Sequence, residues 1–198
     1  MMPMHTLLFA TNNAHKVAEI QPLVPAEIRV ISLKDAGIDR EIPEPYNTLE
    51  ENAREKSRVI LQLSGKDCFS EDTGLEVEAL HGEPGVRSAR YSGEQATHEQ
   101  NITLLLKNLE GVENRRARFR TVISLQWQGS EYQFEGICTG EIIREKSGDQ
   151  GFGYDPVFMP DGASKTFAQM NREEKAQYSH RAKAVAGLVA FLSGNSHS

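Results

Sequence analysis

Apolar and polar positions along the chain follow two periods, one typical of strands and one typical of helices. Residues 6–10 form a short apolar run of the kind found in buried strands, and residues 28–33 alternate apolar with charged positions. The region between them places Val17, Ile20 and Val24 at helical spacing. The start of the chain is therefore predicted to fold as a strand, a polar turn, a helix and a second strand.

Two later segments begin with a capping box, in which Ser or Thr is followed three residues later by Glu or Gln. They predict one helix that begins after Thr48 and runs to about Leu63, and another that begins after Thr97 and ends before Gly111. In the C-terminal part of the chain, one helix is predicted to begin after Asn171 as its cap, and an apolar helix is predicted over residues 185–192.

Two adjacent carboxylates, Glu71 and Asp72, follow a strand-like run that begins at Cys68. Gly74 lets the backbone turn sharply, and the alternation over residues 75–79 predicts that extended chain then resumes. Carboxylates at the end of a rigid strand can hold a divalent cation or act as a general base. An acidic surface turn is the alternative, because Asp-Thr-Gly is also common in turns.

Residues 115–120 contain four arginines, which in isolation suggests a patch that binds RNA or phosphate. The run alternates into an apolar strand, so Arg118 and Arg120 are better explained as one face of an exposed strand. Gln128-Gly129-Ser130 predicts a hairpin turn to a partner strand over residues 132–143. Two long antiparallel strands of this kind are expected to form an exposed or dimer-forming sheet.

The composition is that of one ordinary globular domain of 198 residues, with 38% hydrophobic and 25% charged residues. A net charge of −6 argues against a protein that coats nucleic acid, because such proteins carry a basic excess. Cys68 and Cys138 lie in apolar surroundings, which favours buried free thiols in a reducing compartment. The first ten residues lack the charge and the apolar length of a signal peptide or membrane span, so a cytoplasmic location is expected.

The polar turn after the first strand is a candidate anion site. Thr11 and Asn13 are helix-capping types, and Lys16 would then lie in the first turn of the helix. The helix dipole disfavours a cation at that position, which suggests an anionic partner such as phosphate. A solvated lysine beside an ordinary cap is the alternative.

The last fifty residues offer groups that suit a nucleotide base. Gly151 and Gly153 flank Phe152 and would present its ring for stacking, although a plain glycine-rich turn is the alternative. His180 and Arg181 offer hydrogen-bond donors side by side. As an isolated pair, they are better explained as a surface corner.

Six blocks occur together in an order that is far more specific than any one block. They are Thr11-x-Asn13-x-x-Lys16, Glu51-Asn52-Ala53-x-x-Lys56, Glu71-Asp72-Thr73-Gly74-Leu75, Pro84-Gly85 with Ser88-Ala89-Arg90-Tyr91-Ser92-Gly93, Gly151-Phe152-Gly153-Tyr154-Asp155-Pro156, and Ser179-His180-Arg181. In this order the blocks resemble the HAM1-like nucleoside triphosphate pyrophosphatase family, from about residue 6 to residue 192.

The resemblance implies an α/β fold with a long, twisted, mixed central sheet, helices around two lobes and the active cleft between the lobes. It implies a single two-lobed domain over residues 1–198 and a homodimer, with no nucleic-acid or membrane partner. Two departures from the bacterial pattern stand out. Asn12 replaces a common Gly, and Glu71-Asp72-Thr73-Gly74 replaces Asp-Asp-Ser-Gly, which leaves the division of roles between Glu71 and Asp72 open.

The reaction that the resemblance implies is hydrolysis of ITP, dITP and XTP to the nucleoside monophosphate and pyrophosphate, with Mg²⁺ as cofactor. Its expected catalytic residues are Asp72 as general base, Lys16 and Lys56 on the phosphates, and Glu71. Its expected metal ligands are Asp72, Glu44 and Glu71. Its expected substrate-binding residues are Thr11, Asn12, Asn13, Lys16, Thr73, Phe152, Gly153, Tyr154, Asp155, Lys175, His180 and Arg181.

Two other functions would share some of these features. A Maf-like pyrophosphatase acting on modified pyrimidine nucleotides would use the same chemistry, but the blocks at residues 152–156 and 179–181 favour the purine enzyme. A nucleic-acid-binding protein without catalytic activity is the alternative from another class, and the arginines at residues 115–120 motivate it.

Overall fold

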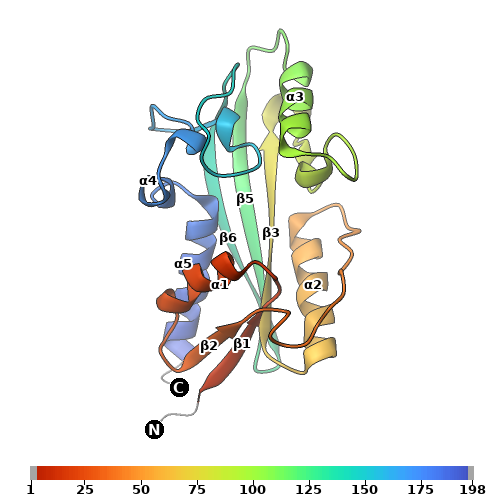
Figure 1. Cartoon of the computed structure of the whole chain (residues 1–198), viewed down its shortest axis with the longest axis vertical. Helices are drawn as coiled ribbons and strands as arrows, with labels where there is room; N and C mark the ends of the chain where they lie inside the picture. The colour runs from red at the N-terminus through yellow and green to blue at the C-terminus, as the bar shows by residue number, and fades with distance from the viewer. Residues whose placement is uncertain (1–3, 196–198) are drawn as a thin grey trace. The chain divides into compact units, whose positions relative to one another are not determined.

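A computed structural model describes residues 4–195, and these residues form two compact units. The first unit contains residues 4–72, 122–135 and 183–195, and the second contains residues 73–121 and 136–182. Figure 1 follows the chain through both units. The prediction of a single domain over residues 1–198 stays a prediction. In the described part of the chain, no helix is long and apolar enough to cross a membrane.

The strands of the described residues form one mixed sheet of seven strands, in the order β2-β1-β3-β5-β6-β7, with β4 paired to β3. The strands are β1 (His5–Phe9), β2 (Ile28–Ile31), β3 (Cys68–Val77), β4 (Pro84–Gly85), β5 (Arg116–Trp127), β6 (Ser130–Ile142) and β7 (Phe158–Pro160). β1 runs parallel to both β2 and β3, whereas β4 is antiparallel to β3 and β7 is antiparallel to β6. The predicted α/β class with a mixed central sheet is confirmed.

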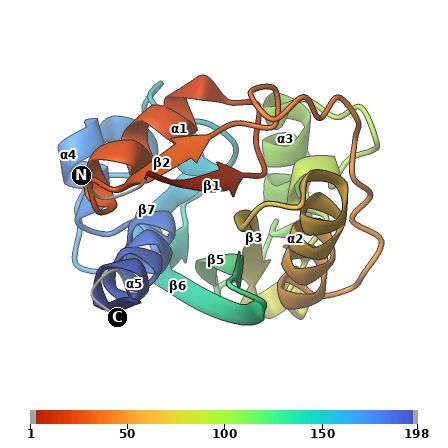
Figure 2. The same cartoon turned by 90° about the horizontal axis from the view of Figure 1, so that it is seen from below.

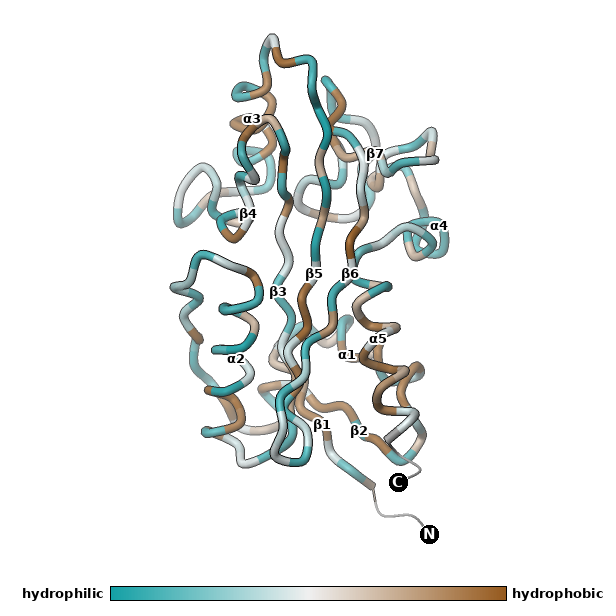
Figure 3. The backbone as a smooth tube through the Cα atoms, turned by 180° about the vertical axis from the view of Figure 1, so that it is seen from behind, coloured by the Kyte–Doolittle hydropathy of each residue, from teal (hydrophilic) through white to brown (hydrophobic). Residues whose placement is uncertain are grey.

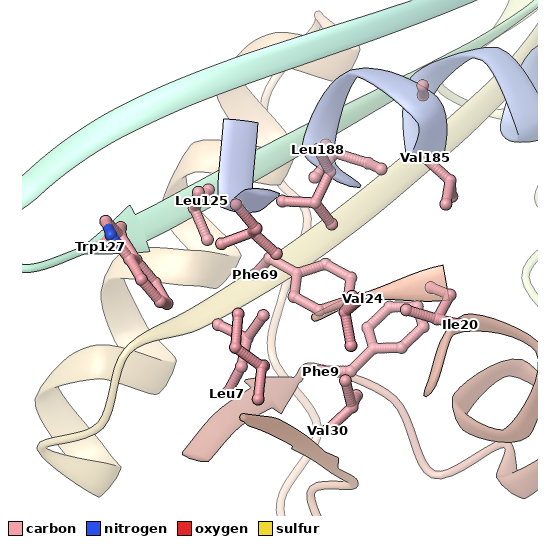
Figure 4. Close-up of a cluster of buried hydrophobic side chains, with 14 residues drawn as sticks. Leu7, Phe9, Ile20, Val24, Val30, Phe69, Leu125, Trp127, Val185 and Leu188 are labelled. Carbon is pink, nitrogen blue, oxygen red and sulfur yellow. The ribbon is translucent and has the colours of Figure 1, made fainter. Parts of the chain in front are cut away.

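The first unit packs helices α1 (Ala14–Ile20), α2 (Leu49–Ser64) and most of α5 (His180–Asn195) with β1, β2 and parts of β3, β5 and β6. Figure 2 shows β1 and β2 side by side, with α1 next to them. Figure 3 shows hydrophobic residues along β1, β2 and much of α5. Phe9 and Phe69 stack at the centre of this core, with their ring centroids 4.3 Å apart, and Leu188 of α5 belongs to the same cluster (Figure 4).

The second unit contains α3 (His98–Asn108) and α4 (Arg172–Ala176). Its core is a separate cluster in which Phe119, Phe158 and Phe167 lie ring to ring. Leu105 of α3 is fully buried in the same cluster. Each unit therefore has its own aromatic core.

The helix caps that the sequence predicts are confirmed. Asn13, Thr48, Thr97 and Asn171 are the N-caps of α1, α2, α3 and α4, and each side chain accepts a hydrogen bond from a main-chain N–H of the first turn. The boundaries agree within a few residues for α2 and α3. The predicted helix over residues 185–192 is the interior of α5, which begins five residues earlier at His180.

The predicted break after the acidic pair is wrong. β3 continues without interruption from Cys68 to Val77, so Glu71 and Asp72 lie in the middle of a strand. Gly74 is buried in that strand and makes no turn. The pattern misleads because a glycine with ordinary strand geometry and a glycine in a turn have the same sequence signature. Extended chain also stops at Val77, and a 3₁₀ helix follows over Glu78–Leu80.

The prediction of an exposed sheet holds for only part of β5. Arg118 is exposed and alternates with buried neighbours, but every residue from Thr121 to Trp127 is buried. The sequence suggests alternation because Thr121, Ser124 and Gln126 are polar, although all three are buried. The hairpin turn is confirmed, since Gln128 and Gly129 both have positive φ angles, as a tight two-residue turn requires.

Truncation of a core leucine tests the packing of the first unit. We expect Leu188→Ala to lower the free energy of unfolding by about 3 kcal/mol, because Leu188 is fully buried and the substitution leaves a cavity. Leu63→Ala is the matched control in α2, since Leu63 is 44% exposed and should cost less than about 1 kcal/mol. Urea denaturation of both variants measures the difference, and equal costs would contradict the described core.

Candidate functional site

Glu71 and Asp72 are neighbours in an unbroken strand, so their side chains project from opposite faces of β3. Both residues are partly buried. The Glu71 carboxylate accepts a hydrogen bond from Lys16 Nζ of α1, at 2.9 Å, and only 9% of the Glu71 side chain is exposed. The fold therefore gives the two acids different surroundings and assigns Glu71 to the side of Lys16.

A second ion pair lies next to the first. Lys56 of α2 is paired with Glu44, and its Nζ also donates a hydrogen bond to the main-chain carbonyl of Glu71, at 3.3 Å. The Lys56 side chain is 16% exposed. Lys16, Glu71, Lys56 and Glu44 thus form a cluster of alternating charge within the first unit, which we call the lysine–glutamate cluster. Three of the four predicted catalytic residues lie in it.

The predicted metal ligands do not all converge. Glu44 pairs with Lys56 of α2, whereas Glu71 contacts Lys56 through its main-chain carbonyl. Cys68 and Ser70 bond main-chain carbonyls of α2, so the alternation along β3 directs Asp72 to the α2 side and the Glu71 carboxylate to the other side. Across residues 4–195, no group of three or more His, Cys, Asp and Glu side chains is arranged to hold a metal ion. Mg²⁺ needs only one or two protein carboxylates when phosphate oxygens and water complete its shell. The donor chemistry of these partly buried carboxylates therefore fits Mg²⁺ bound together with a nucleotide.

The polar turn before α1 uses its side chains to shape the main chain. Asn13 Oδ1 accepts hydrogen bonds from the main-chain N–H groups of His15 and Lys16, at 3.0 and 3.4 Å. Thr11 Oγ1 accepts from Asn13 N, and Asn12 Oδ1 accepts from the main chain of residue 34. Since Asn13 already engages these N–H groups, Lys16 Nζ is the stronger candidate for phosphate. The substrate-binding roles of Thr11, Asn12 and Asn13 stay predictions.

Asn12 has ordinary backbone geometry. Among the described residues, His81 and Gln128 are the non-glycine positions with positive φ. Asn12 therefore does not need the left-handed conformation that a glycine at this position would permit.

In the second unit, Asp155 joins two other predicted substrate-binding residues. Its Oδ2 accepts hydrogen bonds from Phe152 N, at 3.1 Å, and from Lys175 Nζ, at 2.7 Å, while Asp155 itself is only 3% exposed. Lys175 Nζ also lies 4.9 Å from the centroid of the Phe152 ring, within cation–π range. Phe152 is 58% exposed, so a large part of its ring is accessible for stacking.

Two neighbouring positions hold this arrangement in place. Gly151 has φ +74°, and a Cβ there would overlap the Asp155 carboxylate, so only glycine fits. Tyr154 is buried and donates a hydrogen bond from its hydroxyl to the Ser88 carbonyl, at 2.6 Å. Burial raises the pKa of the Tyr154 hydroxyl well above its usual range. Gly153 N donates to His98 Nδ1, which ties the same segment to α3.

His180 and Arg181 form the first turn of α5. The His180 ring is 8% exposed and stacks on Phe119, with 4.7 Å between ring centroids and an interplanar angle of 17°. The surface-corner interpretation is therefore wrong for His180, because tertiary packing draws the ring into the core of the second unit. Arg181 is partly buried beside it. Thr73 lies elsewhere in this unit and shares a hydrogen bond with Thr121, at 2.7 Å between their hydroxyl oxygens.

Sequence reasoning assigned no role to the buried amides Asn52 and Asn101, which are 1% and 2% exposed, although Asn52 stands in one of the six blocks. Each is the fourth residue after a threonine N-cap, in Thr48-Leu49-Glu50-Glu51-Asn52 and Thr97-His98-Glu99-Gln100-Asn101. Asn52 holds the main chain of Tyr46, and Asn101 holds the loop over residues 88–92. In both helices an asparagine follows the threonine N-cap by four residues and lies at an inward-facing position. This repeated pattern in the sequence would have identified both residues.

The arginine run is occupied by partners in its own unit. Arg115 donates to main-chain carbonyls, and Arg116 forms a two-pronged pair with Asp161, with both distances 2.7 Å. That pairing lowers the pKa of Asp161 to about 2. Arg118 and Arg120 both bind the carboxylate of Glu76. These arginines therefore serve intramolecular contacts within the second unit.

The family model described as the Ham1 family matches residues 7–191. The chain belongs to the Ham1 family. This confirms the resemblance of the six sequence blocks, and the match spans both structural units.

Individual relatives agree with this assignment. The chain is 50% identical, over 94% of its length and 98% of the relative's, to a protein of Flavobacterium psychrophilum named dITP/XTP pyrophosphatase. It is 46% identical, over 96% of its length and 98% of the relative's, to a protein of the same name from Porphyromonas gingivalis. The solved structure of the Staphylococcus aureus Ham1 protein is similar with a TM-score of 0.91 and 40% identity, covering 96% of this chain and 99% of that one.

Replacement of Gly151 tests the arrangement around Asp155. We expect Gly151→Ala to lower the free energy of unfolding by about 2 to 4 kcal/mol, because the new methyl group displaces a buried carboxylate and strains the backbone. Gly153→Ala is the matched control, since Gly153 also has positive φ but has open space around it. It should cost about 1 kcal/mol. Chemical denaturation compares the two, and a Gly153 variant as unstable as the Gly151 variant would contradict the overlap.

Proposed function

We infer that this Ham1-family chain hydrolyses the non-standard purine nucleotides ITP, dITP and XTP to the nucleoside monophosphate and pyrophosphate, and so removes them from the nucleotide pool. The observation that carries this inference is the identity of about half of all positions with proteins named dITP/XTP pyrophosphatase, over nearly the whole of both chains. In this reaction, water attacks the α-phosphorus, the bond to the oxygen that bridges the α and β phosphates breaks, and pyrophosphate leaves.

The lysine–glutamate cluster of the first unit supplies groups that suit the phosphates. A triphosphate would compete with Glu71 and Glu44 for the ammonium groups of Lys16 and Lys56. Glu71 and Glu44 would then lose their lysine partners, and Mg²⁺ would balance their negative charge. The lysines would pair with phosphate oxygens in place of the glutamates. Lysines near the leaving group would then neutralise the charge that develops on pyrophosphate.

Asp72, with Glu44 and with Glu71 as a further candidate, would supply the protein oxygens for Mg²⁺. When bound, Mg²⁺ neutralises phosphate charge and lowers the pKa of water in its shell. We assign Asp72 the role of general base, as the family resemblance implies, because the alternation along β3 directs its side chain to the α2 side, where Lys56 pairs with Glu44. A carboxylate is a weak base at neutral pH, and bound Mg²⁺ would make this modest basicity sufficient. The proton of the attacking water therefore passes to the Asp72 carboxylate.

The second unit supplies groups that suit the base. Hypoxanthine and xanthine present a 6-oxo acceptor and a protonated N1, whereas adenine presents a 6-amino donor and a bare N1. Lys175, His180 and Arg181 are donors, so adenine would leave buried donors without partners. Phe152 offers an exposed ring for stacking, and Asp155 fixes both Phe152 and Lys175. We therefore assign Asp155 and Tyr154 to positioning rather than to contact with the base.

The proposal extends to assembly and location. The family resemblance supports a homodimer, which light scattering after gel filtration would detect.

Cys68 and Cys138 are buried free thiols, and burial raises the pKa of the Cys68 thiol to about 12. Free thiols are typical of proteins in a reducing compartment. We therefore propose action in the cytoplasm on free nucleotides, with no nucleic-acid or membrane partner.

A nucleotide panel tests the function directly. With Mg²⁺, we expect pyrophosphate release from ITP, dITP and XTP at rates at least about 100-fold above those for ATP, because adenine does not match the donors of Lys175, His180 and Arg181. Without Mg²⁺, turnover should fall to background. Release of orthophosphate in place of pyrophosphate would contradict the bond assignment. Tight, salt-sensitive binding of oligonucleotides without turnover would favour the nucleic-acid alternative.

Replacement of Asp72 tests the assignment of the general base. We expect Asp72→Asn to lower kcat by about 100-fold or more, because the amide cannot accept the proton of the attacking water. Circular dichroism and urea denaturation should show a folded protein, since the side chains have nearly the same shape. Glu76→Gln is the matched control on the same strand, as Glu76 serves the arginine pairs and should leave kcat within about threefold. Undiminished turnover in the Asp72 variant would contradict the assignment of Asp72 as general base.

A further inference from the structure

Asn52 lies in the first turns of α2 and pairs its side-chain amide with the main chain of Tyr46. Its Oδ1 accepts a hydrogen bond from Tyr46 N, at 2.9 Å, and its Nδ2 donates to the Tyr46 carbonyl, at 3.2 Å. Asn52 is 1% exposed, so both bonds lie in a site where a lost partner is costly. The amide thus holds Tyr46 in the way that a neighbouring strand would.

The segment that Asn52 holds carries Glu44. Residues 38–45 form neither helix nor strand, and Glu44 stands between Pro43 and Pro45. Each proline fixes its own φ, and Pro45 also restricts Glu44 to extended conformations. Because the backbone from residue 43 to residue 45 is stiff, a fixed point at Tyr46 also sets the direction in which the Glu44 side chain leaves the segment.

One face of α2 contacts this segment twice. Asn52 and Lys56 are four residues apart and therefore lie on the same side of the helix. Asn52 holds the main chain at Tyr46, and Lys56 is paired with the carboxylate of Glu44. The first contact is between neutral groups, whereas the second depends on charge.

We propose that Asn52 is a positioning residue that keeps the Glu44 carboxylate in place when Lys56 turns from Glu44 to the phosphates of the substrate. The proposal rests on the proposed function, in which a triphosphate competes for Lys56 and Glu44 contributes to Mg²⁺ binding. Without Asn52, the position of Glu44 would depend on the ion pair that the substrate breaks. The hydrogen bonds from Asn52 to Tyr46 do not depend on charge, so they keep the segment in place when Lys56 leaves Glu44 for the phosphates.

Amide hydrogen exchange in the metal-free protein tests the hold itself. We expect Asn52→Ala to speed exchange of the Glu44 and Tyr46 amides at least about tenfold, because Tyr46 N loses its buried acceptor. Pro43 and Pro45 have no amide hydrogen, so a peptide over residues 43–46 reports only these two sites. Asn101→Ala is the matched control, since Asn101 occupies the same helix position in α3 and holds residues 88–92. It should speed exchange in its own loop and leave residues 43–46 unchanged.

A double-mutant cycle tests the connection to Glu44. We expect Asn52→Ala to raise the Mg²⁺ concentration for half-maximal turnover about tenfold, with a smaller change in kcat at saturating Mg²⁺. In a Glu44→Gln background, Asn52→Ala should cause no further change, because its effect passes through the missing carboxylate. Asn101→Ala should leave the Mg²⁺ dependence unaltered. If Asn52→Ala does not fold, Asn52→Leu, which has a similar shape and removes both hydrogen bonds to Tyr46, replaces it in both arms.

The two arms separate failure of this proposal from failure of the proposed function. Unchanged exchange at Glu44 and Tyr46, or additive effects of the Asn52 and Glu44 substitutions, would overturn the positioning role even in an active enzyme. Absence of pyrophosphate release by the unaltered protein would overturn the proposed function. In that case the exchange arm still decides whether Asn52 holds the segment that carries Glu44.

Discussion

The alternation of side chains along β3 is the constraint on which the candidate site depends. Because the strand is continuous from Cys68 to Val77, Glu71 and Asp72 project from opposite faces although they are adjacent in the chain. Glu71 is nearly buried and needs a cation, since an unpaired charge in such a site is costly, and Lys16 provides one. The two acids therefore differ in surroundings more than in chemistry. A break after Asp72 would remove the geometric basis for giving them separate roles.

The partly buried charges of the candidate site are held by pairing in both units. In the first unit, each lysine of the lysine–glutamate cluster contacts a glutamate that belongs to another part of the chain. In the second unit, Asp155 is buried and satisfies its carboxylate with Lys175 and the Phe152 amide. Pairs of this kind bring little net stability, because desolvation offsets the attraction, but loss of one member leaves the other unpaired. These ion pairs therefore fix the positions of the charged side chains more than they stabilise the fold.

Local signals in the sequence were enough for the helix caps, the hairpin turn at Gln128-Gly129 and the α/β class, because each depends on contacts within a few residues. The ordered sequence blocks identified the family. The continuity of β3 could not be predicted from the sequence, since a glycine next to Asp and Thr is compatible with a strand and with a turn. The burial of His180 and of the polar residues in β5 could not be read either, because both follow from packing against segments distant in the chain.

Asn52 and Asn101 show how this fold orders connecting segments that lie outside its α-helices and strands. Main-chain N–H and C=O groups of a buried or half-buried loop need partners, and an amide side chain can supply both a donor and an acceptor. Placing that amide four residues after a helix cap gives it a rigid base, and Pro43 and Pro45 reduce the conformations that the segment around Glu44 would otherwise sample. The entropy of ordering is then lost during folding, not during binding. A ligand that engages Glu44 gains affinity because its partner is already in position.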